Sequence, residues 1–302
     1  MAKSNMQGKV CLVTGSSSGI GKVTARELAK MGATVVMVCR NRTKGEAAQA
    51  EIKAASGNAQ VDLIVADLSK LSEVRRVASE FKQSYTQLHV LVNNAGGIHS
   101  EHKVTSDGLE FTFATNYLAP FLLTHLLLDV LKASAPARIV NVSSVAHTRG
   151  KVDFADLQGT RRYSFTKAYG QSKLALIYFT YELADQLKGT GVTVNALHPG
   201  VVASNFNDGM KGLAYVIGAV IYTFVGITVE RGAQTTLYLA TSPEVEGVSG
   251  KYFSDCKEVS SSRLSYDVTV RQRLWNVSQE LIRQNELSRC QRLRNLAHPG
   301  FW

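Results

Sequence analysis

Short apolar runs alternate with amphipathic helical patterns along most of this chain. The apolar runs, which we expect to form strands one to six, cover residues 9–14, 33–38, 61–65, 88–92, 138–142 and 192–197. Segments between them, at 43–55, 70–84 and 106–132, carry helical periodicity. Strands that alternate with helices at this spacing indicate βαβ units, a parallel sheet and right-handed crossovers. The predicted fold class is therefore α/β: a single-domain, Rossmann-like, doubly wound parallel sheet with helices on both faces.

The alternation also predicts the domain organisation. No linker, repeat or low-complexity stretch interrupts it, so we expect one domain over residues 1–287. Its last element is a predicted helix from Leu264 to about Glu286. Residues 288–302 are basic and contain a Pro-Gly pair near their end, and we expect a flexible basic tail there.

One uncharged segment stands out, from Leu213 to Val229. A membrane-spanning helix needs about 20 apolar residues, and this run is near that limit. It lies between the sixth strand and a later helix and strand of the same sheet, so spanning a bilayer would separate parts of one core. We therefore expect an apolar substrate lid around residues 201–229, whose outer face could make peripheral membrane contact. A buried core helix is the alternative interpretation.

Composition narrows the classes of partner. Of the 302 residues, 45% are hydrophobic and the net charge is +10. The basic residues are scattered, without a dense run or interleaved aromatics, and this argues against nucleic-acid binding. Anionic lipid, a phosphate-rich cofactor and a plain solvated surface remain as explanations of the charge. No signal-peptide or N-terminal anchor pattern precedes the first strand, so we expect an intracellular protein, cytoplasmic or peripherally membrane-associated. The sequence leaves open whether the protein forms a homo-oligomer.

Cysteine and histidine positions indicate no metal site. The cysteines are Cys11, Cys39, Cys256 and Cys290, and their spacing is not that of metal ligands. Cys11 and Cys39 lie in apolar runs and are interpreted as small buried side chains in a reduced compartment. His147 and His198 are interpreted as loop or pocket residues.

A glycine-rich turn joins the first strand to the first helix, with glycines at 15, 19 and 21. Gly15 permits a tight turn, Gly19 lets a pyrophosphate approach the backbone, and Gly21 allows close packing of helix against sheet. Free N–H groups at the helix N-terminus then face the phosphates. The spacing differs from G-x-G-x-x-G in having three residues between the first two glycines. A plain turn is the alternative.

The end of the second strand indicates the type of dinucleotide. An acidic residue there would bind a ribose 2′-hydroxyl, whereas arginine accommodates a 2′-phosphate. The chain has Arg40, with Arg42 close by and no carboxylate, so NADP(H) is favoured over NAD(H) unless both arginines are solvated loop charges. Asp67, after the third strand, contacts the adenine end in one interpretation; in the other, Asp67 or Ser69 caps the next helix.

Tyr169 and Lys173 are spaced as neighbours on one helix face. A positive charge beside a phenol favours the phenolate and lowers the tyrosine pKa. Such a tyrosine can donate or accept a proton near neutral pH. The pair alone is weak evidence, because this spacing often arises by chance.

Several motifs then coincide in a fixed order. They are Thr14-Gly15-x-x-x-Gly19-Ile20-Gly21, Asn93-Asn94-Ala95-Gly96, Ser144, Tyr169-x-x-x-Lys173 and Pro199-Gly200. Over residues 8–285 the chain resembles the short-chain dehydrogenase/reductases. It is most similar to the retinol dehydrogenase group. The marks of that group are Val38-Cys39-Arg40, Val142-Ser143-Ser144-Val145-Ala146-His147, His198-Pro199-Gly200, Gly250-Lys251-Tyr252-Phe253 and Arg273-Leu274-Trp275.

The resemblance implies specific roles. Tyr169 would be the general acid/base, and Lys173 would lower its pKa and bind the nicotinamide ribose. Ser144 and Tyr169 would bind the substrate oxygen, and Asn116 would hold a water that links Lys173 to solvent. Asn93 and Gly96 would line the cofactor cleft. The full set expected at the cofactor is Gly15, Ser17, Ser18, Gly19, Ile20, Gly21, Arg40, Asp67, Leu68, Asn93, Ala95, Gly96, Tyr169, Lys173, Pro199, Gly200 and Val202.

Together these features predict an NADP(H)-dependent oxidoreductase that interconverts a lipophilic alcohol and its aldehyde or ketone. Retinol and retinal are the favoured substrates, on the resemblance and the apolar lid. A steroid or other lipid carbonyl reductase is the alternative within the enzyme class. A non-catalytic NADP(H)-sensing protein is the alternative outside it. The long polar loop between Ser144 and Tyr169 either shapes the substrate entrance or is a solvated surface loop.

Overall fold

The structure, a computed structural model, describes residues 5–200 and 227–297, with side chains described up to Leu287. One eight-stranded sheet runs through the molecule in the order β3-β2-β1-β4-β5-β6-β7-β8. Neighbouring strands are parallel except β7 and β8, which are antiparallel. The strands are β1 (Val10–Thr14), β2 (Thr34–Cys39), β3 (Val61–Val65), β4 (Val90–Asn93), β5 (Ala137–Val142), β6 (Val192–Leu197), β7 (Tyr252–Ser254) and β8 (Lys257–Glu258). The predicted doubly wound parallel sheet is confirmed.

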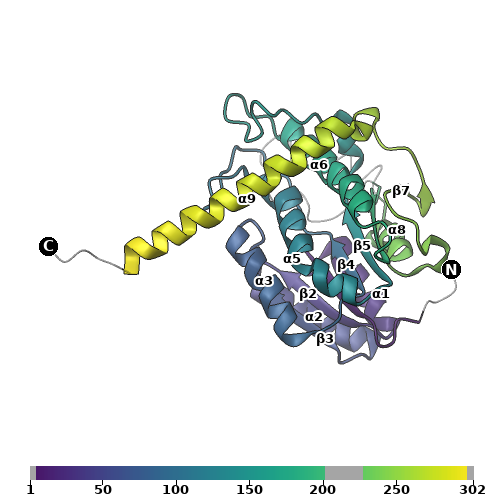
Figure 1. Ribbon diagram of the computed structural model, residues 1–302. Coiled ribbons are helices and arrows are strands. Elements are labelled where there is room, and N and C mark those ends of the chain that lie inside the picture. Colours follow the sequence, from purple (N-terminus) through teal and green to yellow (C-terminus); the bar gives the residue numbers. More distant parts are fainter. Residues whose placement is uncertain (1–4, 201–226, 298–302) are drawn as a thin grey trace.

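Helices cover both faces of this sheet (Figure 1). On one face α1 (Gly19–Lys30), α2 (Arg42–Ser56) and α8 (Val229–Thr241) share a hydrophobic core with the sheet. On the other face α3 (Leu71–Ser84), α5 (Ala119–Ala133), α6 (Phe165–Gln186) and α9 (Val268–Ala297) form the larger core. Short helical turns complete the fold: α4 (Phe111–Phe113), η1 (Ala114–Leu118), η2 (Val145–Arg149), η4 (Pro243–Val245) and η5 (Arg263–Tyr266).

The helix predicted at 106–132 begins later, at Phe111. Glu110 caps it, because its carboxylate accepts hydrogen bonds from the N–H groups of Thr112 and Phe113 at 2.8 and 2.7 Å. Val104 and Glu110 pair as an isolated antiparallel bridge that closes a turn over residues 105–109, so these residues do not join the helix. Among the described helices, the one from Phe111 to Ala133 is apolar and long enough to cross a membrane, but 78% of its most apolar window is buried inside the protein. It is a core helix here.

The C-terminal helix differs from the prediction at both ends. It begins at Val268 rather than Leu264 and continues to Ala297, so residues 288–297 are helical where a flexible tail was expected. No glycine or proline occurs between Val268 and Ala297, and the first proline afterwards is Pro299. Because these are the residues that break helices most strongly, the helix continues. In Figure 1, α9 crosses α6 and α5 and projects beyond the body of the molecule.

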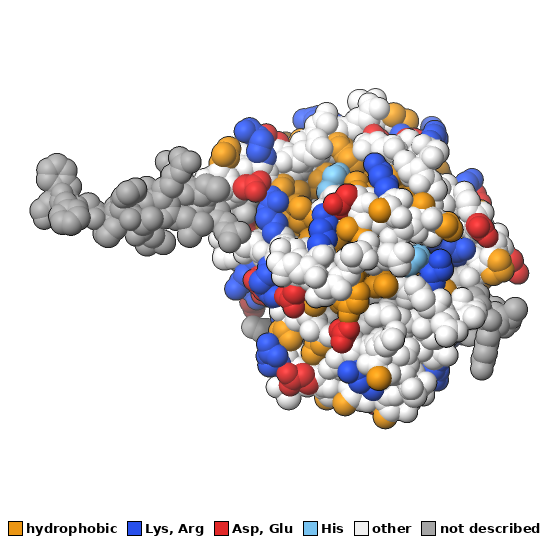
Figure 2. Space-filling model, turned by 60° about the horizontal axis from the view of Figure 1, so that its bottom comes forward, with side chains coloured by type: hydrophobic (Ala, Val, Ile, Leu, Met, Phe, Trp, Pro, Cys, Tyr) orange, Lys and Arg blue, Asp and Glu red, His pale blue; other side chains and the backbone are white. Residues whose placement is uncertain are grey.

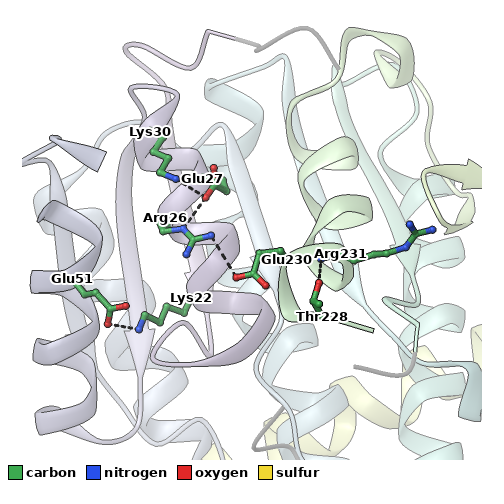
Figure 3. A network of polar contacts seen from close by, with 8 residues as sticks. All are labelled: Lys22, Arg26, Glu27, Lys30, Glu51, Thr228, Glu230 and Arg231. Carbon is green, nitrogen blue, oxygen red and sulfur yellow. Dashed lines mark hydrogen bonds and ion pairs between the residues drawn. The ribbon is translucent and has the colours of Figure 1, made fainter. Parts of the chain in front are cut away.

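Ion pairs connect α1 to both of its helical neighbours (Figure 3). Lys22 pairs with Glu51 of α2, and Arg26 lies 3.8 Å from Glu230 in the first turn of α8. These groups are partly or largely exposed, so each pair contributes about 0–1 kcal/mol. On the face shown in Figure 2, Lys and Arg side chains are interspersed with Asp and Glu, which agrees with the scattered charge of the sequence.

Candidate active site

A cavity of about 520 Å³ opens where the strands β1, β2, β3 and β4 end. The carboxyl ends of parallel strands are where open α/β sheets bind ligands. Eight residues predicted for the cofactor line this cavity: Gly15, Ser17, Ser18, Arg40, Asp67, Leu68, Ala95 and Gly96. Ten further residues, not predicted from the sequence, also line it: Val38, Cys39, Asn41, Lys44, Ala66, Gly97, Ile98, His99, Phe111 and Thr115.

The glycine-rich turn between β1 and α1 has the left-handed backbone conformation that glycine permits. Gly15 and Gly19 have φ of +68° and +57°, in the left-handed region that disfavours side chains. Gly19, Ile20 and Gly21 form the first turn of α1 rather than the cavity wall. A Cβ at Gly21 would lie 2.4 Å from the Gly15 oxygen, so only glycine allows the helix to approach this closely.

The N-terminus of α1 is open to an anion. Its N-cap residue, Ser18, makes no side-chain hydrogen bond to the helix, and no other described side chain accepts from the first N–H groups of α1. Ser17 and Ser18 line the cavity. These donors and the bare glycine backbone fit the pyrophosphate of a dinucleotide.

Thr14 and Asn94, for which no role was predicted from the sequence, hold the turn in place. The Thr14 hydroxyl accepts hydrogen bonds from the backbone N–H groups of Asn94 and Ala95 at 3.0 and 2.9 Å. The Asn94 amide nitrogen donates to the carbonyls of Thr14 and Gly15. These bonds join the end of β4 to the end of β1. Their signal in the sequence is the motifs themselves, which contain both residues.

The far end of the cavity is basic. Arg40 follows β2 and is exposed, and no carboxylate of the described residues pairs with it. Lys44, in the first turn of α2, lines the cavity as well. Arg42 does not line it and instead pairs with Glu46 at 3.3 Å. The second cation near a bound 2′-phosphate would therefore be Lys44 rather than Arg42.

Asp67 lines the cavity, and the alternative capping role is wrong. Its carboxylate accepts from the backbone N–H and the hydroxyl of Ser69, at 3.1 and 2.8 Å. The N–H of Leu71, where α3 begins, donates instead to the Asp107 carboxylate at 2.7 Å.

Lys173 is buried, with 3% of its surface exposed, and burial lowers its pKa to about 8. Its ammonium donates to the Val142 carbonyl at 2.9 Å and lies 5.8 Å from the centre of the Tyr169 ring. Tyr169 and Lys173 both belong to α6, so the prediction that they lie one turn apart on one helix is confirmed. A Cβ at Gly96 would lie 3.5 Å from the same nitrogen, which places Lys173 at the cleft wall.

Asn116 lies beside this pair. Its amide exchanges two hydrogen bonds with the backbone of Gly97, both of 2.9 Å, and also donates to the Ser172 hydroxyl at 3.1 Å. Asn116 lies in the π-helical turn η1, where the helix register widens. The structure thus joins Asn116 to the loop after β4, at residues 96–97, and to α6.

Ser144 follows β5 and caps the short helix η2. Its hydroxyl oxygen accepts from the Ala146 N–H at 3.2 Å, so its own hydrogen is available to another acceptor. Ser143 is different: its hydroxyl donates to the Lys173 carbonyl at 2.9 Å and is buried. Close contact between Gly150 and Gly170 seats η2 against α6, because a Cβ at Gly150 would lie 2.2 Å from the Gly170 oxygen. Ser144 is therefore held beside the turn of α6 that carries Tyr169.

Asn93 does not line the cleft as predicted. Its side chain is buried, and its amide nitrogen donates to Thr124 and Asn141 at 3.1 and 2.8 Å. Asn141 in turn donates to Thr180. The side chain thus serves a polar network that joins β4 and β5 to α5 and α6. The hydrophobic strand pattern gives no information about which side of β4 an end residue faces.

The region after β6 is described only in part. Gly200 has φ of +84°, and its N–H donates to the His198 ring at 3.2 Å. Pro199 precedes it, whereas Val202 and residues 201–226 of the expected lid lie outside the described residues. Within the described part of the chain, no group of three or more His, Cys, Asp or Glu side chains is arranged to hold a metal ion.

Comparisons with known proteins agree with this geometry. The family described as short chain dehydrogenase matches residues 9–211. Retinol dehydrogenase 12 of Mus musculus is 48% identical over 275 residues, which cover 91% of this chain and 86% of that protein. An uncharacterised protein from Mycobacterium paratuberculosis superimposes with a TM-score of 0.75 at 34% identity, covering 93% of this chain and 95% of that one. RhlG of Pseudomonas aeruginosa, solved as a complex with NADP, gives a TM-score of 0.66 at 27% identity, covering 82% and 95%. The chain belongs to the short-chain dehydrogenases, and it is an oxidoreductase of that family.

Proposed function

We propose that this protein is an NADP(H)-dependent oxidoreductase that interconverts a lipophilic alcohol and its aldehyde or ketone. The observation that carries the proposal is the buried ammonium of Lys173 beside Tyr169. No carboxylate of the described residues pairs with Lys173, so the fold leaves an uncompensated charge in its interior. Burying a charge without a counter-charge is unfavourable, so such a charge is expected where it takes part in catalysis.

The proposed chemistry divides between cofactor and protein. A bound nicotinamide supplies or accepts the hydride. Tyr169 donates the proton when a carbonyl is reduced and accepts it when an alcohol is oxidised, and Lys173 stabilises the phenolate form. The Ser144 hydroxyl, whose hydrogen is not engaged by Ala146, donates to the substrate oxygen as negative charge develops there. Asn116 fixes the loop after β4 at Gly97 and holds a water beside Lys173.

Two observations favour NADP(H) over NAD(H). Arg40 and Lys44 line the cavity beside the end of β2, and no acidic residue follows that strand. An acidic residue would bind a 2′-hydroxyl, whereas this pair of cations suits a 2′-phosphate. The structural neighbour RhlG was solved with NADP, which agrees with the same choice.

The substrate class rests on similarity and on sequence. The 48% identity to a retinol dehydrogenase favours retinol and retinal. The uncharged segment 213–229 favours a lipophilic substrate and peripheral membrane contact, although it lies almost entirely outside the described residues. A steroid or other lipid ketone is the second candidate, because an apolar pocket distinguishes poorly among lipophilic molecules.

The test measures NADPH-dependent conversion of retinal to retinol by chromatography, beside a steroid ketone and an aliphatic aldehyde. Tyr169→Phe is expected to lower kcat by about 100-fold or more and to leave NADPH binding nearly unchanged, because it removes only the proton donor. Tyr178→Phe is the matched control on the same helix; it removes a phenol that bonds the Leu264 carbonyl and should keep turnover. Full activity of Tyr169→Phe, or no activity of the natural protein on any of the three substrates with either cofactor, would contradict the proposal.

A further inference from the structure

A buried histidine, His147, connects the turn that carries Ser144 to the C-terminal part of the chain. It lies in η2 and is 2% exposed. Its Nε2 is 3.0 Å from the backbone nitrogen of Ser262, and its Nδ1 is 2.7 Å from the carbonyl oxygen of Ser144. The proposed function assigns no role to this side chain.

The partners of His147 determine where its proton lies. A backbone N–H can only donate, so the Ser262 bond requires a lone pair on Nε2. Burial lowers the pKa of His147, which favours the neutral ring. A neutral ring with a lone pair on Nε2 carries its hydrogen on Nδ1. Nδ1 therefore donates to the Ser144 carbonyl.

The Ser144 carbonyl thus receives two donors from one residue. The His147 backbone N–H also points to it, at 3.1 Å. On the other side of the same residue, the Ser144 hydroxyl accepts from Ala146. The position of the hydroxyl therefore depends on a peptide group that His147 clamps from within the fold.

We propose that His147 is a positioning residue for Ser144: its Nδ1–H fixes the Ser144 peptide so that the serine hydroxyl points at the substrate oxygen. This inference rests on the proposed role of Ser144. A shift of the peptide by about 1 Å would misplace the hydroxyl, and misplacements of that size reduce turnover by up to about 100-fold. Ground-state binding depends on it less, because the bond to the substrate oxygen strengthens as charge develops.

A competing explanation gives His147 a purely structural role, with the bond to Ser262 as its purpose. In that case His147 would hold the segment after β8 against η2. A third group lies near as well: the Tyr252 hydroxyl of β7 is 3.3 Å from Nδ1 and could be the true recipient of its proton. The two nitrogen atoms must therefore be tested separately.

Replacing His147 with asparagine or with glutamine tests the bond to Ser144 and the bond to Ser262 separately. The amide nitrogen of asparagine occupies roughly the place of Nδ1 and can donate to Ser144, but it leaves Ser262 without an acceptor. The amide oxygen of glutamine reaches the place of Nε2 and can accept from Ser262, but it leaves the Ser144 carbonyl without the side-chain donor. Each variant thus keeps one bond and loses the other.

The experiment measures kcat, KM and the melting temperature of full-length His147→Asn, His147→Gln and Tyr252→Phe with NADPH and the best substrate. We expect His147→Gln to lower kcat by about 10- to 100-fold with KM within about threefold. We expect His147→Asn to keep kcat within about threefold, even where its melting temperature falls. Tyr252→Phe should keep kcat.

Two outcomes would overturn the inference. The first is an equal loss of kcat in the Asn and Gln variants that follows their melting temperatures, which would show a purely structural role. The second is a loss in Tyr252→Phe as large as in His147→Gln, which would make Tyr252 the group that His147 serves. Ser144→Ala distinguishes these failures from failure of the proposed function, because full activity in that variant would remove the role of Ser144 itself.

Discussion

At the residue scale, the buried ammonium of Lys173 is expected to lower the stability of the fold in return for its proposed role in the reaction. Its ammonium is buried and has one backbone acceptor, and burial lowers its pKa from 10.5 to about 8. A shift of this size corresponds to a burial cost on the order of 3 kcal/mol. We therefore expect the charge to destabilise the cofactor-free fold.

Replacing Lys173 with methionine is therefore expected to stabilise the cofactor-free protein at pH 7 by about 1–3 kcal/mol, while turnover is lost. The lost bond to Val142 offsets part of the gain, by about 1 kcal/mol. Between pH 8 and 10.5 the natural folded state releases the Lys173 proton while the unfolded state keeps it, so the stability of the natural protein rises with pH. The advantage of the variant should shrink over that interval.

Urea unfolding of both proteins at pH 7 and pH 9.5, without cofactor, measures this difference. A variant less stable than the natural protein at pH 7 would show that Lys173 contributes net stability to the fold. A difference that does not change with pH would show that the lysine titrates outside this interval.

At the scale of elements, the first turn of α2 carries two cations, Arg42 and Lys44, whose side chains face different parts of the molecule. Residues two apart on a helix lie about 200° apart around its axis, so they do not share a face. Lys44 accordingly lines the cofactor cavity, whereas Arg42 pairs with Glu46. The sequence shows both cations near the end of β2 and cannot tell which one faces the cavity until the start of the helix is known.

Lys44→Met is expected to weaken NADPH binding by about 10-fold or more and to change NADH binding little, because a charge-assisted bond is worth about 1.5–3 kcal/mol. Arg42→Met is the matched control, and it should leave the affinity for both cofactors within about twofold. Fluorescence titration of the four variant–cofactor pairs measures the effect. Equal weakening of NADPH and NADH by Lys44→Met, or an effect of Arg42→Met as large as that of Lys44→Met, would contradict the assignment.

A comparison of predicted and observed strands and helices shows which parts of the fold can be predicted from the sequence. Strands β1 to β6 are predicted to within two residues, because a buried parallel strand is an uninterrupted apolar run. One later strand of the sheet was expected after the uncharged segment, but β7 and β8 have three and two residues, too few for a pattern to give their bounds. The helix expected from residue 106 starts at Phe111 because Glu110 caps it, a contact that composition does not reveal.

Among the candidate site residues, the place of the motif residues in the fold follows from the sequence, and their tertiary contacts do not. Gly15, Ser144, Tyr169 and Lys173 lie at strand ends or on a helix, so the alternation of elements brings them to one edge of the sheet. The buried contacts of Asn93 and His147 run to residues far away in the chain. Those contacts follow from packing and not from spacing, so sequence patterns could not supply them.

At the scale of the whole molecule, the larger core depends on the C-terminal helix. Trp275 of α9 is 8% exposed and packs against the rings of Phe121 and Phe179, with ring centres 5.1 and 5.9 Å away. Arg271 of the same helix pairs with Glu182 and Asp185 of α6. Since α9 follows residues 201–226 in sequence but packs on helices that precede them, the chain is expected to unfold as one unit.

This expectation of a single domain can be tested with Trp275 as the reporter. The chain has two tryptophans, so Trp302→Phe leaves Trp275 as the only one. Urea unfolding followed by fluorescence then reports α9, and far-UV circular dichroism reports all helices. Coincident midpoints are expected, because exposing Trp275 requires opening the core that holds α5 and α6. NADPH at about 100 times its Kd should raise both transitions equally, by about 2.7 kcal/mol. A fluorescence transition at lower urea than the dichroism transition, or one that NADPH does not shift, would show that α9 unfolds separately from the domain that binds the cofactor.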